Sequence, residues 1–551
     1  MKKTKISRHT AKFKKIILKD HCKQLYIIGS ADCFRFMEEK GMIEDLKREL
    51  NSKKQLTENG AVGYTTTGKD LLDLNFKTSS LRNMDEEEIV NMFLKAYFED
   101  KLLAIKWLFF MRNVREGIGE RRSFRVILKE LGDTYPDIVR ELIPLIPEYG
   151  RYDDLYCLLD GELKGDVSRF IYLQLLKDVS NRWEGKPISL LAKWLPKEST
   201  KKYKEAYKVL LKEFNLSPAE YRKIVSDLRK YSNVLEVKLS ANEWSSVDYN
   251  TVPSKANLLY RNAFYRHDTE RRIEYLEKLK SGDTDTKINA KVLMPHEIVN
   301  KYDVSWYEPQ KYDESLEQLW KALPDYVKGD GFSLFVRDGS GSMTSTIGKT
   351  NVSCLDVSTA LAIYFAERCK GEYKDTFITF SSKPKVIDLS KCSSLQEKLQ
   401  KCYAEDDCSN TDIYEVFDLV LKTAVKNEYT QEQLPKNIVV ASDMEFDHAT
   451  TVGGYWNRSS YANMNALFED IQEEYEAAGY KVPRLVFWNI CSRTGTIPLQ
   501  ENDNGVCLVS GFNPTIMDMV LSGELNPYKC LVDKLNSNRY DAIEEAIADL
   551  V

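Results

Sequence analysis

The stretch FVRDGSGSMTSTIGKT, residues 335–350, ends an apolar run with an acid, three glycines, several hydroxyl side chains and a terminal Gly-Lys-Thr. Residues of these types serve three different sites: a loop that wraps a phosphate, a turn that carries a serine nucleophile, and a loop that binds a divalent cation. The spacing of the glycines and hydroxyls distinguishes these three sites.

A phosphate-binding loop requires a glycine, four further residues and then Gly-Lys-Ser/Thr, because successive backbone N–H groups must wrap the phosphate. Gly348, Lys349 and Thr350 supply the end of that pattern, but Met343 stands where its first glycine belongs. Gly341 lies two residues too early. The spacing therefore argues against a nucleotide-binding loop.

A serine nucleophile in a strand-to-helix elbow needs glycine two residues before it and two after it. Around Ser340 those positions hold Asp338 and Ser342, and around Ser342 they hold Ser340 and Thr344. His448 is the one histidine near a later strand end, and it lacks an orienting partner in the sequence. We therefore expect no catalytic residues and no enzymatic activity.

An acid and two hydroxyls remain at alternate positions, Asp338, Ser340 and Ser342, where the strand leaves its sheet. Downstream, Thr411 lies in a polar loop before a helical segment, and Asp443 ends the apolar run NIVVASD. Oxygen ligands with few carboxylates suit Mg²⁺, so the pattern predicts a magnesium site. In the simpler alternative, Asp338 and Thr411 cap helices and the serines form a polar turn.

The chain changes its hydrophobic pattern near residue 331. From about Glu86 to Lys230 apolar residues recur at helical spacing without a fixed repeat, which predicts an irregular array of antiparallel helix pairs. After about Gly331, β-rich runs alternate with helical stretches, which is typical of a mostly parallel sheet with ligands at the carboxyl ends of its strands. We expect a basic, partly helical extension over 1–55, a helical-repeat module over 56–325, and an α/β domain with a C-terminal helical tail over 326–551.

The composition is that of a globular protein of two or three domains: 551 residues, 43% hydrophobic and 30% charged, with a net charge of −5. The longest apolar runs are interrupted by charge and are shorter than the roughly 20 residues of a membrane span, so we expect no membrane segment. Residues 1–19 carry eight Lys/Arg and no acid, but they lack the apolar core of a secretory signal. The eleven cysteines form no CxxC pair, which favours reduced thiols in a cytoplasmic protein.

The Asp-x-Ser-x-Ser sequence, the downstream Thr and the Asp after the next core strand together resemble the metal-ion-dependent adhesion site (MIDAS) of von Willebrand factor A domains. The resemblance covers about residues 330–523 and implies a Rossmann-like fold. It implies that Ser340 and Ser342 hold Mg²⁺ or Mn²⁺ directly and that Thr411 contributes its hydroxyl. Asp338 and Asp443 would act directly or through waters. An open coordination position would be filled by an Asp or Glu of a protein partner.

The sequence departs from that family at Met444 and Glu445, which follow Asp443 where glycine is common. Glu445 and Asp447 add negative charge near the site, which we expect to affect the choice of ligand more than metal binding.

The helical half also resembles a known module. RNVREGIGERRSFRVIL from Arg112, followed by IPEYGRYDDLYCLL from Ile146, is similar to the TROVE module of the Ro autoantigen and telomerase-associated proteins, a ring of HEAT-like helical repeats. With TENGAVGYTTTG (57–68), TVPSKAN from Thr251 and MPHEIV from Met294, the chain is most similar to an uncharacterised family of this architecture, number 2828 among domains of unknown function. In Ro proteins this module binds small non-coding RNAs.

Two functions are therefore expected. The first is a non-catalytic ribonucleoprotein scaffold with a metal-dependent adhesion site; the alternative is a metal-dependent protein-interaction module on a helical scaffold that binds no RNA. Arginines clustered within fourteen residues can neutralise RNA phosphates, with an affinity that depends on salt. These are Arg112, Arg115, Arg121, Arg122 and Arg125. In the alternative, they pair locally with the neighbouring glutamates.

Overall fold

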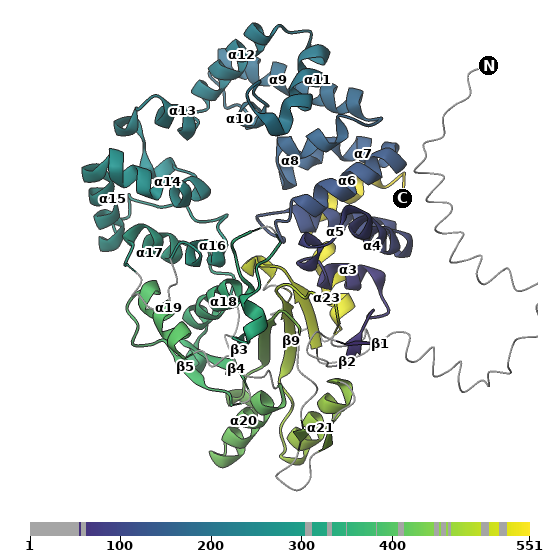
Figure 1. The fold of residues 1–551 in the computed structure, drawn as a ribbon, viewed down its shortest axis with the longest axis vertical. Coiled ribbons are helices and arrows are strands. Elements are labelled where there is room, and N and C mark those ends of the chain that lie inside the picture. The colour runs from purple at the N-terminus through teal and green to yellow at the C-terminus, as the bar shows by residue number, and fades with distance from the viewer. Residues whose placement is uncertain are drawn as a thin grey trace, which may run out of the picture.

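The computed structural model describes residues 54–56, 62–302, 311–327, 333–348, 350–381, 383–405, 413–445, 451–452, 459–460, 464–497, 506–516, 519 and 526–551. In these residues a helical half is followed by an α/β half (Figure 1). Most of the predicted basic extension lies outside them. The described part of the extension is residues 54–55, which begin strand β1 (Lys54–Leu56); this strand pairs antiparallel with β2 (Val62–Tyr64). No helix within the described ranges is long and apolar enough to cross a membrane.

Helices make up nearly all of the first half, as the apolar spacing predicts. They are α3 (Asp70–Phe76), α4 (Glu86–Glu99), α5 (Lys101–Arg112), α6 (Arg122–Thr134), α7 (Pro136–Leu142), α8 (Ile146–Tyr149), α9 (Lys164–Trp183), α10 (Leu191–Trp194), α11 (Lys204–Phe214), α12 (Pro218–Tyr231), α13 (Leu235–Ser240), α14 (Ser254–His267), α15 (Thr269–Ser281), α16 (Pro295–Val299) and α17 (Glu314–Lys321). Short 3-10 turns join several of them, including η1 (Ser80–Arg82) and η3 (Tyr152–Leu158).

Side-chain caps explain where some of these helices begin. Asp85 accepts a hydrogen bond from the backbone N–H of Glu88 at the start of α4, and Asp100 accepts one from Leu103 at the start of α5. Each cap satisfies a backbone donor that has no partner within the helix. Because Asp100 both ends α4 and caps α5, the two helices join without a longer loop.

Six strands form the sheet of the second half, in the order β10-β9-β6-β3-β4-β5. Their bounds are β3 (Ser333–Asp338), β4 (Thr376–Phe380), β5 (Val386–Asp388), β6 (Asn437–Ser442), β9 (Arg484–Asn489) and β10 (Val506–Ser510). The β4–β5 pair is antiparallel and the other pairs are parallel, which confirms the predicted mostly parallel sheet. β7 (Thr451–Val452) and β8 (Ser459–Ser460) form a separate short pair.

The helices of the second half connect and flank these strands. They are α18 (Cys354–Arg368), α19 (Leu395–Ala404), α20 (Ile413–Lys426), α21 (Met464–Ala477), α23 (Pro527–Leu535) and α24 (Asp541–Ile547). α18 packs against β3, β4 and β6, and its residues are buried along almost its whole length. The last two helices, α23 and α24, lie where a C-terminal helical tail is expected.

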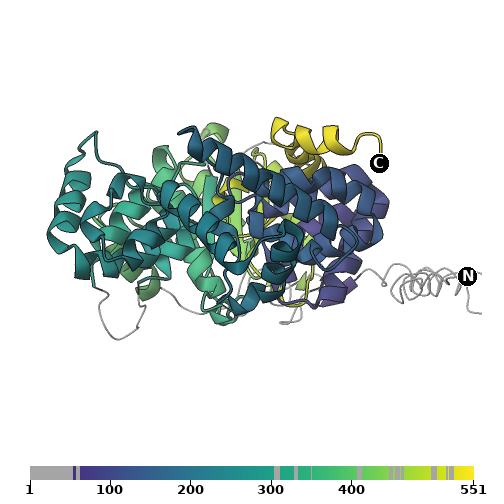
Figure 2. The ribbon, with the colours of Figure 1, turned by 90° about the horizontal axis from the view of Figure 1, so that it is seen from above.

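The two halves are joined at several places. Figure 1 shows the helices of the first half following a curved path whose two ends both return to the α/β half. At its beginning α3 packs against β10, and at its end α16 packs against α18. The tail packs back onto the first half through α24, which contacts α5 and α7; Figure 2 shows it (yellow) beside the first helices (purple).

Buried hydrogen bonds cross this junction. The side-chain amide of Asn489 donates to the carbonyl of Phe76 at 2.8 Å, and that of Asn513 donates to the carbonyl of Gly117 at 2.6 Å. The hydroxyls of Ser79 and Ser510 lie 2.9 Å apart. Because unpaired polar groups are costly to bury, these pairs fix the two halves in one arrangement.

Candidate functional site

The parallel pairing of β3 and β6 brings Asp338 and Asp443 to the same edge of the sheet. The register runs from Ser333 opposite Asn437 to Arg337 opposite Ala441. Asp338 is the last residue of β3 and Asp443 directly follows β6. Both carboxylates are buried, with 1% of each residue exposed. Two acids more than a hundred positions apart therefore meet at the carboxyl ends of neighbouring strands, where ligands bind in sheets of this kind.

Both oxygens of the Asp338 carboxylate accept hydrogen bonds. One accepts the backbone N–H of Ser340 at 2.9 Å, and the other accepts the hydroxyl of Ser442 at 2.5 Å. Burial raises the pKa of Asp338 above its ordinary value, and these hydrogen bonds oppose that rise. A carboxylate whose two oxygens are both engaged is suited to hold a metal-bound water rather than the metal itself.

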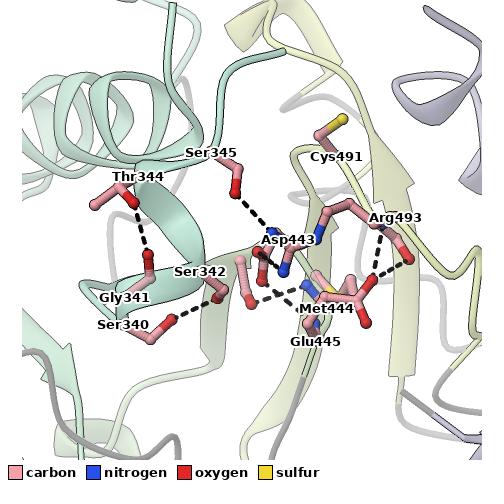
Figure 3. A network of polar contacts seen from close by, with 12 residues as sticks. Ser340, Gly341, Ser342, Thr344, Ser345, Asp443, Met444, Glu445, Cys491 and Arg493 are labelled. Carbon is pink, nitrogen blue, oxygen red and sulfur yellow. Dashed lines mark hydrogen bonds and ion pairs between the residues drawn. The ribbon is translucent and has the colours of Figure 1, made fainter. Parts of the chain in front are cut away.

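The two predicted serines lie on the turn that follows Asp338. The 3-10 turn η7 (Gly341–Thr344) places the hydroxyls of Ser340 and Ser342 3.0 Å apart (Figure 3). The side chain of Met343 in this turn is fully buried and anchors the turn to the core. The hydroxyl of Thr344 donates to the carbonyl of Gly341 at 2.8 Å. The turn therefore presents two half-exposed hydroxyls together, next to the buried acids.

Asp443 has one oxygen without a hydrogen-bond donor. Its Oδ1 accepts the backbone N–H of Glu445 at 3.3 Å, whereas its Oδ2 is buried and has no hydrogen-bond partner among the described residues. Among the described residues, Arg493 brings a cation to Oδ2, with its Nη2 3.5 Å away. Burial, and then the charge of Asp338, raise the pKa of Asp443 to about 7. The hydroxyl of Ser342, the backbone N–H of Glu445 and the charge of Arg493 favour the charged carboxylate, but they do not offset its burial beside a second acid.

Arg493 is the residue of this site that sequence reasoning missed. It follows β9, and its Nη1 donates to the hydroxyl of Ser345 at 2.6 Å. Glu445 fixes the backbone of the loop after β9, because its carboxylate accepts hydrogen bonds from the backbone N–H groups of Arg493 at 2.8 Å and Thr494 at 2.9 Å. The negative charge that we expected Glu445 to add near the site is therefore stabilised by the backbone N–H groups of this loop.

Thr411 and Asp447 lie outside the described residues. Met444, where glycine is common in von Willebrand A domains, is buried and has a φ of +62°, in the left-handed region that favours glycine. Its backbone N–H donates to Ser442 at 3.0 Å. The backbone thus keeps the conformation that glycine allows, although the residue is methionine.

These residues fit a small, hard divalent cation. Mg²⁺ and Mn²⁺ take oxygen ligands, and the site offers two adjacent hydroxyls, two acids and one buried carboxylate oxygen without a donor. The described residues contain no group of three or more His, Cys, Asp or Glu side chains arranged for a metal. A metal here would therefore depend on the serine hydroxyls.

The clustered arginines divide into two kinds. Arg112 is buried, and its Nε donates to Asp154 at 2.8 Å. Arg125 donates from Nε to the other oxygen of Asp154 at 2.6 Å, and its Nη2 lies 2.9 Å from Asp153. Paired buried carboxylates hold both guanidinium groups inside the fold. Ion pairs therefore hold both arginines, and their assignment to a phosphate-binding surface stays a prediction.

The other three arginines lie nearer to solvent, beside one that the sequence did not single out. Arg115 donates to the carbonyl of Glu148, and Arg122 to the carbonyl of Met84. Arg121 Nε has no hydrogen-bond partner within the described part of the chain. Arg151 lies over the ring of Trp194, 4.4 Å from its centroid. Burial and the charge of Arg121 lower the pKa of Arg151 to about 10.

Comparisons with known proteins divide the chain near the same point as its hydrophobic pattern does. A family described as a domain of unknown function, DUF2828, matches residues 188–331, which supports the predicted resemblance over that part of the chain. A second domain of unknown function, DUF7788, matches residues 333–544. Because neither description names a von Willebrand A domain, that resemblance stays a prediction.

One relative matches most of the chain. It is an uncharacterized protein, L728, of Acanthamoeba polyphaga mimivirus, which is 29% identical over 87% of this chain and 86% of its own length. Among solved structures, the Ro (RSR) protein of Deinococcus radiodurans aligns with 77% of this chain and 92% of its own, at 12% identity and a TM-score of 0.36. A TM-score this low does not establish a shared fold.

Proposed function

We propose that this protein is a non-catalytic scaffold whose α/β half binds Mg²⁺ or Mn²⁺ and, through the metal, an acidic group of a protein partner. The observation that carries the proposal is the buried Oδ2 of Asp443, which has no hydrogen-bond donor among the described residues and lies beside a second buried acid. A divalent cation would balance both charges. It would also leave a coordination position for a carboxylate from outside.

Each residue has a part that follows from its contacts. Ser340 and Ser342 would bind the metal directly, because their hydroxyls lie together on the half-exposed turn. Asp443 would use Oδ2. Asp338 would act through a water, because both of its oxygens already accept hydrogen bonds. The bound metal supplies positive charge and an open coordination position, and the chain supplies the fixed oxygens.

The combined variant Ser340→Ala and Asp443→Ala tests the metal centre. Calorimetric titration with Mn²⁺ should show binding to the wild-type chain and none to this variant, because a hydroxyl ligand and the carboxylate have both been removed. The fold should survive, since the substitution removes a carboxylate whose burial is unfavourable. Thr344→Ala, on the same turn, is the matched control and should bind Mn²⁺ as the wild type does. Unchanged binding by the double variant would refute the metal centre.

RNA binding by the helical half is the second candidate function. The sequence resembles the TROVE module, and one local feature favours an anion there: Arg121 Nε has no hydrogen-bond partner among the described residues, and the charge of Arg121 lowers the pKa of Arg151. Phosphate groups relieve such repulsion, and each contact with a phosphate makes binding more sensitive to salt. In this proposal the protein is a ribonucleoprotein scaffold that resembles Ro proteins.

Filter binding of the full chain to total cellular RNA over a salt series tests this candidate. The variant Arg121→Gln with Arg151→Gln should bind several-fold more weakly and should lower the salt dependence by about two phosphate contacts. Arg140→Gln, on α7, removes an exposed arginine that already pairs with Asp137 and Asp166, and it should change neither quantity. If the wild-type chain retains no RNA at low salt, only the metal-dependent protein-interaction function remains.

A further inference from the structure

Arg493 is the cation that the fold itself brings to the candidate metal centre. Its Nη2 lies 3.5 Å from Asp443 Oδ2, and its Nη1 donates to Ser345 at 2.6 Å. The guanidinium thus bridges the acid after β6 and the turn that carries the serines (Figure 3). It pairs with the one oxygen of Asp443 that accepts no hydrogen bond in the described structure.

This placement makes two cations compete for one oxygen. The proposed metal centre uses Asp443 Oδ2, and the guanidinium of Arg493 pairs with that same oxygen at 3.5 Å. A metal ion and a guanidinium that contact the same oxygen repel each other strongly where water is largely excluded, and Asp443 is 1% exposed. Metal binding therefore requires the guanidinium to move away or to find another anion.

The guanidinium is placed to meet such an anion. The Arg493 side chain is 32% exposed, so part of it faces solvent, while its backbone stays fixed by Glu445. Guanidinium groups pair with planar and tetrahedral oxyanions through two parallel N–H donors, which makes them specific for such groups. An oxyanion that approaches the metal centre from solvent therefore meets Arg493 beside it.

We propose that Arg493 couples the two ligands of this site: an oxyanion from a partner draws Arg493 away from Asp443, so that oxyanion and divalent cation bind cooperatively. The inference rests on the proposed metal centre and deepens it. In the absence of an oxyanion Arg493 weakens metal binding, and in its presence this effect is removed. By linkage, bound metal strengthens oxyanion binding by the same factor.

Titration of the full chain with Mn²⁺, followed by the electron paramagnetic resonance signal of the free ion, tests this coupling. Arg493→Gln in chloride should bind Mn²⁺ about tenfold more tightly than the wild type, because a competing positive charge is gone. Replacement of chloride by acetate or by sulfate at constant ionic strength should tighten Mn²⁺ binding to the wild type and leave Arg493→Gln unchanged. The two anions show whether a carboxylate or a tetrahedral oxyanion is the better partner.

Two further variants separate charge from structure. Arg493→Lys keeps the positive charge and should behave as the wild type does in chloride. Ser345→Ala leaves the arginine but removes the hydroxyl that holds it, and it should tighten Mn²⁺ binding by a smaller factor. Equal or weaker Mn²⁺ binding by Arg493→Gln, or an anion effect that persists in it, would overturn the inference and leave the metal centre intact. If neither the wild type nor Arg493→Gln binds Mn²⁺, the metal centre and the coupling both fall.

Discussion

Arg272, on α15, is a fully buried guanidinium that donates hydrogen bonds to neutral side chains. The rings of Tyr249, Phe264 and Tyr275 surround it, with centroids 5.1 to 5.3 Å from its central carbon. Its two amino groups donate to Asn257 at 3.4 Å and to Ser315 at 3.1 Å. Burial lowers the pKa of Arg272. The attraction between cation and rings offsets part of the desolvation of this charge.

Two replacements of Arg272 distinguish the contribution of its side-chain volume to stability from the contribution of its charge. Arg272→Met fills most of the same space without the desolvated charge, so we expect its free energy of unfolding to lie within about 1 kcal/mol of the wild type. Arg272→Ala leaves a cavity among the three rings and should cost about 3 kcal/mol or more. Urea unfolding followed by circular dichroism measures both. If the methionine variant is as unstable as the alanine variant, the charge and its ring contacts stabilise the fold more than the volume does.

At the level of single elements, the strands that the sequence predicts are those buried on both faces. β3, β6 and β9 have apolar centres and polar ends, and nearly every residue in them is buried, as central parallel strands require. β5 has no clear signal in the sequence, because it is three residues long and Val386 within it is 61% exposed. An edge strand of this length has no hydrophobic pattern of its own and depends on its pairing with β4.

The candidate site divides in the same way. Asp338, Ser340 and Ser342 are predictable because they occupy every second position where a strand ends. Asp443 is predictable because it directly follows the neighbouring strand. Arg493 contacts Ser345 from 148 residues away, and no spacing in the sequence signals that contact. Likewise, the sequence places Arg112 and Arg115 in one cluster, but the position of Asp154 in the fold decides that Arg112 is the one inside.

At the level of the whole molecule, the two ends of the helical half meet on the α/β half at one aromatic side chain. Phe512, just after β10, has the guanidinium of Arg82 from η1 over its ring at 4.2 Å. The ring of His296, on α16, lies edge-on to Phe512 with centroids 5.4 Å apart. Residues from the beginning and the end of the helical path therefore share this contact, which closes the path onto the sheet.

His296 makes this closure sensitive to pH. Burial, with the charges of Arg82 and Lys255, lowers its pKa to about 4, although Glu297 opposes the shift. Because the unfolded chain takes up a proton near pH 6.5 and the folded His296 near pH 4, the contribution to stability is present above pH 6.5 and falls by about 1.4 kcal/mol per pH unit between those values. Acid should therefore loosen α16 first.

The variant His296→Phe, which keeps an aromatic ring but cannot be protonated, should lose less stability than the wild type on acidification. We expect the fall in Tm from pH 7 to pH 4.5 to be several degrees smaller in the variant, and hydrogen exchange within α16 to accelerate at pH 4.5 in the wild type, after correction for the intrinsic effect of pH on exchange. Titrating groups away from His296 act equally in both proteins, so the comparison isolates this imidazole together with its neighbour Glu297, whose pKa His296 lowers. An identical fall in Tm in the wild type and the variant would show that the contact between the helical half and the sheet does not depend on the protonation of His296.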